Sequence, residues 1–177
     1  MRRLTLTLLL LAGCAHASPD ARPGARPNAQ SAPSVTPEEL TAAPGHLELE
    51  PLTLSQNGRP ELTLRADGRV ERSDGRVLGT LGRDGRFLDP RGQLLAELTS
   101  EGEILDGAGE YLPVTIDREG AAKLLKENRR IELHDDGSLA GANPSGPVVT
   151  VAGVTARTRR TAMFLLVLSA YPVRPRS

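Results

Sequence analysis

The sequence predicts a mainly β fold, built as an antiparallel meander or as a stack of β-hairpin repeats. One observation is a 17-residue period, in which glycines recur at alternating steps of ten and seven residues: Gly58, Gly68, Gly75, Gly85, Gly92, Gly102 and Gly109. The other is an alternation of apolar and polar residues between these glycines. Such alternation is typical of strands that bury one face and expose the other.

The second turn of each repeat unit has the composition of a tight hairpin turn. It contains Asp67-Gly68, Asp84-Gly85 and Glu101-Gly102, and the pattern continues at Glu119-Gly120 and Asp136-Gly137. Glycine accepts a positive φ, and a preceding aspartate tolerates the turn. Buried columns are expected on either side of these turns: Leu64, Leu81 and Leu98 before them, then Val70, Phe87 and Ile104 after them.

The repeat changes after Ile116, where the spacing predicts a short helix near 119–130. Ala121 and Leu124 have helical spacing there, and Arg129-Arg130 would suit the negative end of the helix dipole. A strand over 131–133 follows, then a loop over 141–147 and a strand over 148–154.

The C-terminal segment is expected to form a helix over 156–170 that packs on the sheet. Thr155 would cap its start, and Pro172 would end it. The alternative is a central strand. The run 163–168 is apolar on every side, and periodicity does not distinguish the two structures over so short a run.

The residues before the repeat have a different composition. Residues 15–45 contain six prolines and no apolar periodicity, which indicates a disordered, extended spacer. We therefore expect Cys14 and a tether over 14–45, followed by a single β-repeat domain over 46–177.

The first fourteen residues have the pattern of a targeting sequence. Two arginines precede an apolar stretch that is too short to span a membrane, and the stretch ends in Leu11-Ala12-Gly13-Cys14. This motif resembles the lipobox of bacterial lipoprotein precursors. The resemblance implies a signal peptide over 1–13, lipidation of Cys14, and attachment to membrane lipid through the acylated Cys14. Ala15, in place of an aspartate, favours the outer membrane of the bacterial cell envelope, with the domain facing the periplasm or the surface.

Composition and motifs exclude several classes of function. The 22 basic residues balance the 22 acidic ones, and aromatics make up 2%, which argues against binding nucleic acid. The single Cys excludes an internal disulfide, and the triplet His134-Asp135-Asp136 is interpreted as a strand-end turn. We expect no catalytic residue, no metal, no cofactor and no enzymatic activity. Arg59, Arg69, Arg76 and Arg86 recur after turn glycines and are interpreted as part of a solvated face.

The leading functional hypothesis is therefore a non-enzymatic, structural or interaction role for a lipid-anchored domain, with a protein partner in the envelope. The alternative is a periplasmic ligand-binding lipoprotein, which would use a groove between the sheet and the C-terminal segment.

Overall fold

Twelve antiparallel strands and one helix make up the part of the chain that the computed structural model describes, residues 46–171 and 173. The strands are β1 (Leu52–Gln56), β2 (Arg59–Leu64), β3 (Arg69–Arg72), β4 (Val77–Leu81), β5 (Arg86–Leu88), β6 (Leu94–Leu98), β7 (Glu103–Asp106), β8 (Tyr111–Ile116), β9 (Ala122–Leu124), β10 (Arg129–Leu133), β11 (Leu139–Ala140) and β12 (Val149–Ala152). The helix α2 (Arg159–Ala170) follows them. The leader, Cys14 and the tether expected over 1–45 lie outside the described residues.

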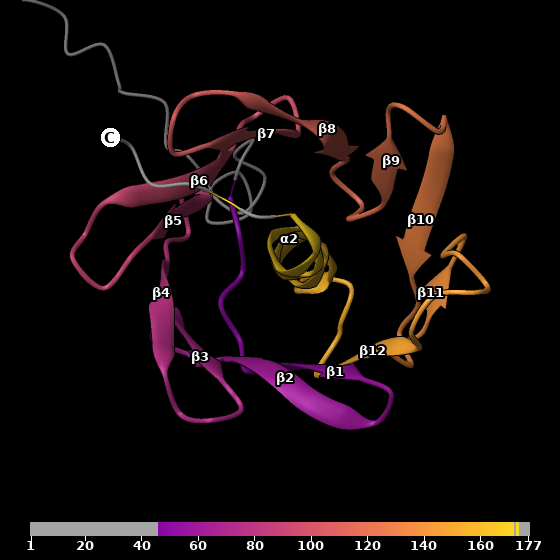
Figure 1. Ribbon diagram of the computed structural model, residues 1–177, viewed down its shortest axis with the longest axis horizontal. Coiled ribbons are helices and arrows are strands. Elements are labelled where there is room, and N and C mark those ends of the chain that lie inside the picture. The colour runs from indigo at the N-terminus through magenta and orange to yellow at the C-terminus, as the bar shows by residue number, and fades with distance from the viewer. Residues whose placement is uncertain (1–45, 172, 174–177) are drawn as a thin grey trace, which may run out of the picture. The chain divides into compact units, whose positions relative to one another are not determined.

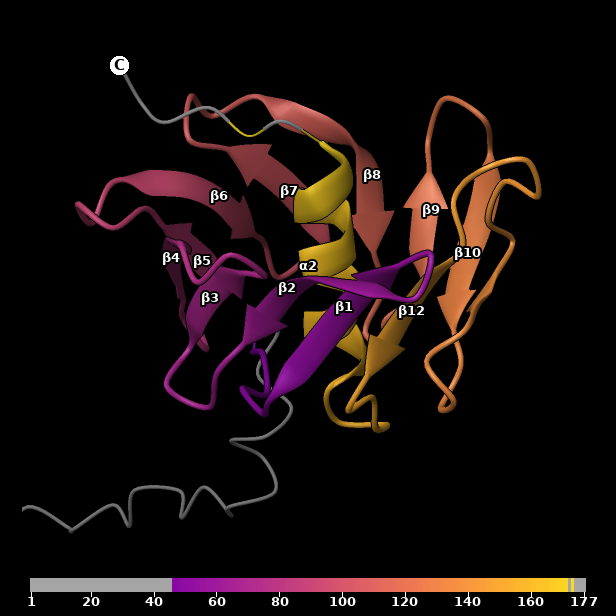
Figure 2. The same ribbon diagram turned by 60° about the horizontal axis from the view of Figure 1, so that its bottom comes forward.

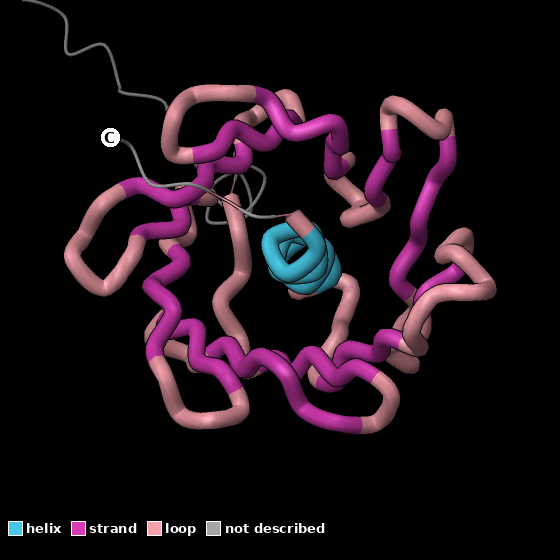
Figure 3. The backbone as a smooth tube through the Cα atoms, viewed as in Figure 1, coloured by secondary structure: helices cyan, strands magenta, loops and turns pink. Residues whose placement is uncertain are grey.

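The strands form one sheet in which each strand from β1 to β11 lies beside its neighbour in the sequence, while β12 returns to pair with β1. The mainly β, antiparallel meander predicted from the sequence is thus confirmed. The sheet curls around α2 as a nearly closed ring of hairpins (Figures 1 and 3). A hydrogen bond of 2.9 Å from the amide of Val151 in β12 to the carbonyl of Gly137 helps to close it.

Two kinds of turn connect the strands. Outer turns join β1 to β2, β3 to β4, β5 to β6, β7 to β8 and β9 to β10, which gives five hairpins, and an outer loop connects β11 to β12, which do not pair with each other. These connections point away from the helix (Figure 1). Inner turns connect one hairpin to the next and carry the Asp-Gly or Glu-Gly pairs. In many turns an aspartate side chain accepts the amide two residues later, as Asp67 does from Arg69 at 3.0 Å. This local bond stabilises the turn and explains why aspartate recurs there.

The inner glycines Gly68 and Gly102 lie directly against the backbone of the next hairpin. Gly102 has φ +87°, and a Cβ at this position would come 2.1 Å from the carbonyl oxygen of Ile116. The carbonyl of Gly102 accepts a hydrogen bond of 2.7 Å from the amide of Ile116. Outer glycines such as Gly92 also have a positive φ, but a Cβ there would meet nothing within 4 Å. The 17-residue unit therefore needs glycine for two reasons: for a positive φ at both turns, and, at Gly68 and Gly102, for a close backbone contact at the inner turn.

Helix α2 lies inside the ring, and its apolar side chains form the core together with the inner face of the sheet (Figure 2). Phe164 is fully buried, and Met163 is 2% exposed. The expected C-terminal helix is confirmed, although it begins at Arg159 and not at residue 156. The cause lies in the preceding turn, where Thr155 and Thr158 hydrogen-bond each other's amides at 2.8 and 3.2 Å. The helix ends where Tyr171 turns extended, the conformation that a residue before proline prefers.

The short helix expected near 119–130 is wrong, because this segment forms β9, a turn and β10. Ala122 pairs with Ile116 on β8 and with Ile131 on β10, so it continues the meander. The turn uses Asn128 at φ +48°, a conformation that a helix interior does not contain. The pairing of neighbouring strands thus overrides local helix propensity. The strands expected over 131–133 and 148–154 correspond to β10 and β12, while β11 has no counterpart in the prediction.

The first described residues run along the helix start. Leu47 is fully buried, and its amide donates to the carbonyl of Arg83 at 2.8 Å. The hydroxyl of Thr161 in α2 donates to the carbonyl of Glu48 at 2.8 Å. The Glu48 carboxylate also lies 3.8 Å from Arg157. The described chain therefore enters the domain at the N-terminal end of α2.

Candidate functional site

A cavity of about 620 Å³ lies between the inner face of the sheet and the C-terminal half of α2. It exists because α2 is not centred: the strand closest to the helix is β8, and β6, β7 and β8 contribute no residue to the lining. The lining comes from the other strands, from Pro147 and from the helix: Leu54, Gln56, Glu61, Leu62, Val70, Arg72, Leu78, Phe87, Ala122, Leu124, Ile131, Leu139, Val149, Met163 and residues 165–171.

The exposed fractions of these side chains distinguish the deep part of the cavity from the part near solvent. Val70, Phe87 and Met163 are 2%, 6% and 2% exposed, so they form the deep part of the cavity. Leu62 and Leu166 are only half-buried and lie nearer to solvent. The aliphatic side chains of two separate elements therefore face a common space without filling it. The volume of about 620 Å³ and the largely apolar lining are within the range of small-molecule sites in proteins.

Polar residues gather at one side of this lining. Gln56 ends β1, Glu61 belongs to the start of β2, and Arg72 ends β3. Arg72 pairs across the sheet with Leu62, which is the neighbour of Glu61. Ser169, near the C-terminal end of α2, is the fourth polar residue of the lining. Arg72 and Ser169 are exposed, and Gln56 and Glu61 are half-buried, so these lining residues lie where the cavity meets solvent. We call them the polar mouth: Gln56, Glu61, Arg72 and Ser169.

The two charged residues of the polar mouth have no charged partner within the described chain. Neither Glu61 nor Arg72 lies within 4.0 Å of an opposite charge among residues 46–171 and 173. Other arginines nearby are paired: Arg65 and Arg69 both contact Glu71, at 2.9 and 3.0 Å. The mouth therefore presents one cation and one anion that do not neutralise each other directly.

Sequence reasoning placed a possible groove between the sheet and the C-terminal segment, and the cavity lies in this region. It did not identify the lining residues. A signal was present, because Gln56 continues the inward phase of Leu52 and Leu54, and Arg72 continues that of Val70. Polar residues in phase with a buried column indicate a place where the inner face meets solvent.

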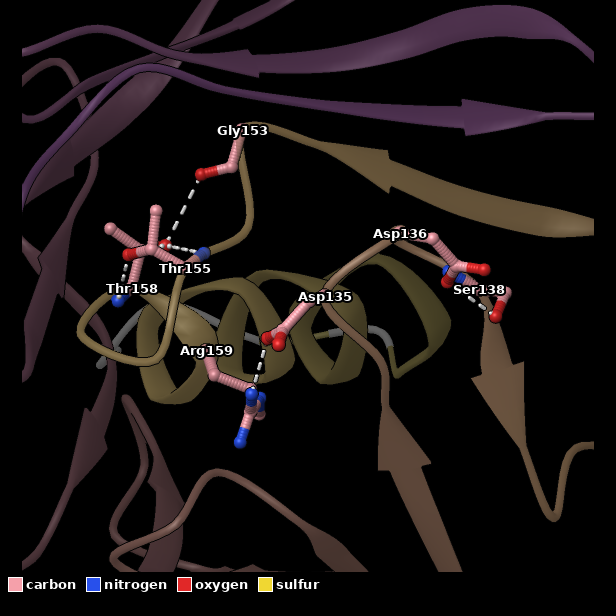
Figure 4. A network of polar contacts seen from close by, with 7 residues as sticks. All are labelled: Asp135, Asp136, Ser138, Gly153, Thr155, Thr158 and Arg159. Carbon is pink, nitrogen blue, oxygen red and sulfur yellow. Dashed lines mark hydrogen bonds and ion pairs between the residues drawn. The ribbon is translucent and has the colours of Figure 1, made fainter.

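A second, smaller cavity of about 270 Å³ is lined by His134 and Asp135, the first two residues of the triplet His134-Asp135-Asp136. The triplet forms a strand-end turn as expected, closed by the amide of Gly137 on the carbonyl of His134 at 2.9 Å. Figure 4 shows Arg159 reaching from α2 to Asp135, with Nη2 2.5 Å from Oδ1. Hydrogen bonds from the side chain and amide of Ser138 lower the pKa of Asp136. These contacts attach the turn to the helix start.

Arg160 lies on the same turn of the helix and is almost completely buried, at 8% exposure. Burial is the main cause that lowers the pKa of its guanidinium, and the nearby Arg118 adds to it. Its Nε has no hydrogen-bond partner within the described part of the chain. Gly120 packs on this turn, where a Cβ would lie 2.7 Å from the Arg160 amide nitrogen. The helix start is therefore covered by protein.

The remaining predicted residues are placed as follows. Arg59, Arg69, Arg76 and Arg86 are all exposed. Across residues 46–171 and 173, no three His, Cys, Asp or Glu side chains come together as a metal site. No helix in this part of the chain has the length and apolarity needed to cross a membrane. Cys14, the predicted lipidation site, lies outside the described residues.

Comparisons with protein-family models, with curated proteins and with solved structures find no match for the chain.

Proposed function

We propose that this chain is a lipid-anchored protein of the bacterial cell envelope whose domain binds an apolar ligand between the sheet and α2. The observation that carries the proposal is the cavity of about 620 Å³ with its largely aliphatic lining. Small-molecule sites usually measure about 300–1,000 Å³ and combine an apolar wall with a few polar groups. At about 30 Å³ for each water molecule, the cavity has room for about 20 water molecules, or for a ligand of that total volume.

The physical argument rests on the half-buried side chains. Leu124, Ile131 and Leu139 on the sheet, with Leu166 and Leu168 on the helix, keep apolar surface accessible inside the fold. Covering such surface is favourable by about 25 cal/mol per Å². A ligand with an apolar body would gain this free energy without rearranging the strands, because the hydrogen-bonded ring already holds the wall in place.

Two neighbouring valines give a matched test. Val149 lines the cavity, whereas Val148 is 67% exposed and lies outside it. We expect the full chain carrying Cys14→Ser to bind the uncharged fluorophore N-phenylnaphthylamine saturably. Val149→Trp, which fills the cavity, should weaken this binding about tenfold, and Val148→Trp should leave it unchanged. Circular dichroism checks that both variants fold. Binding that never saturates, or that responds equally to both substitutions, would refute the proposal.

The anchor and location rest on the leader sequence. The motif Leu11-Ala12-Gly13-Cys14 supports lipidation of Cys14, and Ala15 supports sorting to the outer membrane. Acyl chains contribute about 0.8 kcal/mol per buried CH₂, so more than one chain gives lasting attachment. Metabolic labelling with palmitate should mark the wild-type chain and not Cys14→Ala. Equal labelling of both would contradict the anchor.

The structural or interaction role that leads the sequence-based hypotheses stays a prediction. Among the described residues, the large apolar side chains exposed to solvent are Tyr111, Leu125 and Val148. They lie in three separate places: at the start of β8, between β9 and β10, and just before β12. A pull-down from envelope extracts that recovers no reproducible partner would count against this role. The cavity makes ligand binding the function with the more specific support.

A further inference from the structure

The polar mouth adds chemical information to the ligand class. We propose that the ligand is a zwitterionic amphiphile with a single apolar chain, whose anionic and cationic head-group charges face Arg72 and Glu61. This inference rests on the proposed function, because it assigns the chemistry of the ligand that the same cavity binds.

The first step is the separation of apolar and polar lining. The deep part consists of Val70, Phe87 and Met163, none more than 6% exposed, and it offers no charged group. Arg72 is the last residue of β3 and is exposed, and the half-buried Glu61 lies near the start of β2. A ligand that satisfies both regions has an apolar chain at one end and a polar head at the other.

The second step is the charge of the head. Arg72 lines the cavity and lies within 4.0 Å of no carboxylate among residues 46–171 and 173. Its guanidinium suits a phosphate or carboxylate, which it binds in a bidentate manner. Glu61 is half-buried in the same lining and equally without a cationic partner in that part of the chain. An anionic head alone would satisfy Arg72 and be repelled by Glu61.

The third step concerns hydrogen bonding. Gln56 and Ser169 supply neutral donors and acceptors from two sides of the mouth, one on β1 and one on α2. Ser169 donates to the carbonyl of Leu166 at 2.7 Å, so its oxygen remains an acceptor. A head group that carries an ammonium or hydroxyl beside its anion makes use of these groups. A purely aliphatic ligand would leave them facing apolar surface.

The test uses three probes whose aliphatic chains have the same length. Myristoyl lysophosphatidylethanolamine is the zwitterion, myristate the anion and tetradecylamine the cation. Each displaces N-phenylnaphthylamine from the full chain carrying Cys14→Ser, below its micelle concentration. The zwitterion should bind most tightly. Arg72→Gln should weaken the zwitterion and myristate about fivefold or more, and Glu61→Gln should weaken the zwitterion and tetradecylamine similarly.

Arg76→Gln is the matched control. Arg76 is exposed, as Arg72 is, and faces it across the same outer turn, but it does not line the cavity. It should leave all three affinities unchanged. If either cavity variant fails to fold, the salt dependence of the wild-type protein replaces it, because recognition by charge weakens as ionic strength rises. Wild-type affinity for myristate should then fall with salt.

The outcomes separate the two proposals. Equal affinity for the three probes would overturn the zwitterion proposal, and so would affinities that do not change with Arg72→Gln and Glu61→Gln. Saturable binding of the fluorophore in the same experiment would still support the cavity as a binding site. Preference for myristate that Arg72→Gln removes and Glu61→Gln strengthens also overturns it, in favour of a purely anionic head. Absence of any saturable binding refutes the proposed function itself.

Discussion

Replacing one inner and one outer glycine by alanine measures how strongly the close approach between hairpins constrains the repeat. Gly102 and Gly92 have φ values of +87° and +80°, so an alanine is strained at either position. The strain of a side chain in this conformation is about 1–2 kcal/mol. Alanine also lowers the conformational entropy of the unfolded chain, which offsets about 0.4–1 kcal/mol of this strain. We expect Gly92→Ala to lose about 1 kcal/mol of stability.

Gly102→Ala adds two further costs. Its Cβ would lie 2.1 Å from the Ile116 carbonyl oxygen, a backbone atom that moves only if the next hairpin moves. Overpacking of this kind costs about 1–3 kcal/mol. The shift would also weaken the 2.7 Å bond between the Ile116 amide and the Gly102 carbonyl, worth about 1 kcal/mol. We therefore expect a total loss of about 3–5 kcal/mol.

Urea denaturation followed by circular dichroism measures both variants. With a slope of about 2 kcal/mol per molar urea, the midpoint should fall by about 0.5 M for Gly92→Ala and by about 1.5 M or more for Gly102→Ala. An unchanged slope would show that the transition remains comparable between the variants. Equal losses at both positions would refute the reasoning, since the close approach would then contribute nothing.

Three other predictions concern the helix and its surroundings. Phe164→Ala should cost about 3–5 kcal/mol in the same assay because the ring is fully buried, whereas Tyr111→Ala, at a site 65% exposed, should change stability by less than about 0.5 kcal/mol. Thr158→Val should cost about 1–3 kcal/mol, since it removes a buried hydroxyl that donates to the Gly153 carbonyl, and the exposed Thr150→Val serves as its control. NMR titration should find that Ser138→Ala raises the pKa of Asp136 towards its ordinary range. In the wild type this lowered pKa favours folding above the unfolded-state pKa, and the contribution disappears as the pH falls through the folded-state pKa. An Asp136 pKa that Ser138→Ala leaves unchanged would contradict that assignment.

Local signals made the meander predictable. The turn at Asp67-Gly68 depends on a positive φ and on a hydrogen bond two residues away, both of which are encoded within a few positions. The buried columns follow from a period of two residues, so Val70, Phe87 and Ile104 were placed correctly on the inner face.

Non-local distances were not predictable in the same way. Residues 121–127 have good helix propensity, and only the partners on β8 and β10 make them a strand and a turn. The cavity depends on how far α2 stands from each wall, and no spacing in the sequence expresses that distance. The sequence alone therefore does not distinguish Arg72 and Glu61 from other surface charges, because their place in the lining depends on the position of the helix.

The position of α2 in the chain has a consequence for biogenesis. Helix α2, residues 159–170, follows all twelve described strands in the sequence, so the ribosome makes the strands before the element that packs inside their ring. Until then the inner faces of the hairpins lack their partner, and the carbonyl of Glu48 lacks the hydroxyl of Thr161, which lies 113 residues further along the chain. The core can therefore form only after α2 has been synthesised. A product that stops before Arg159 should expose its apolar face and aggregate.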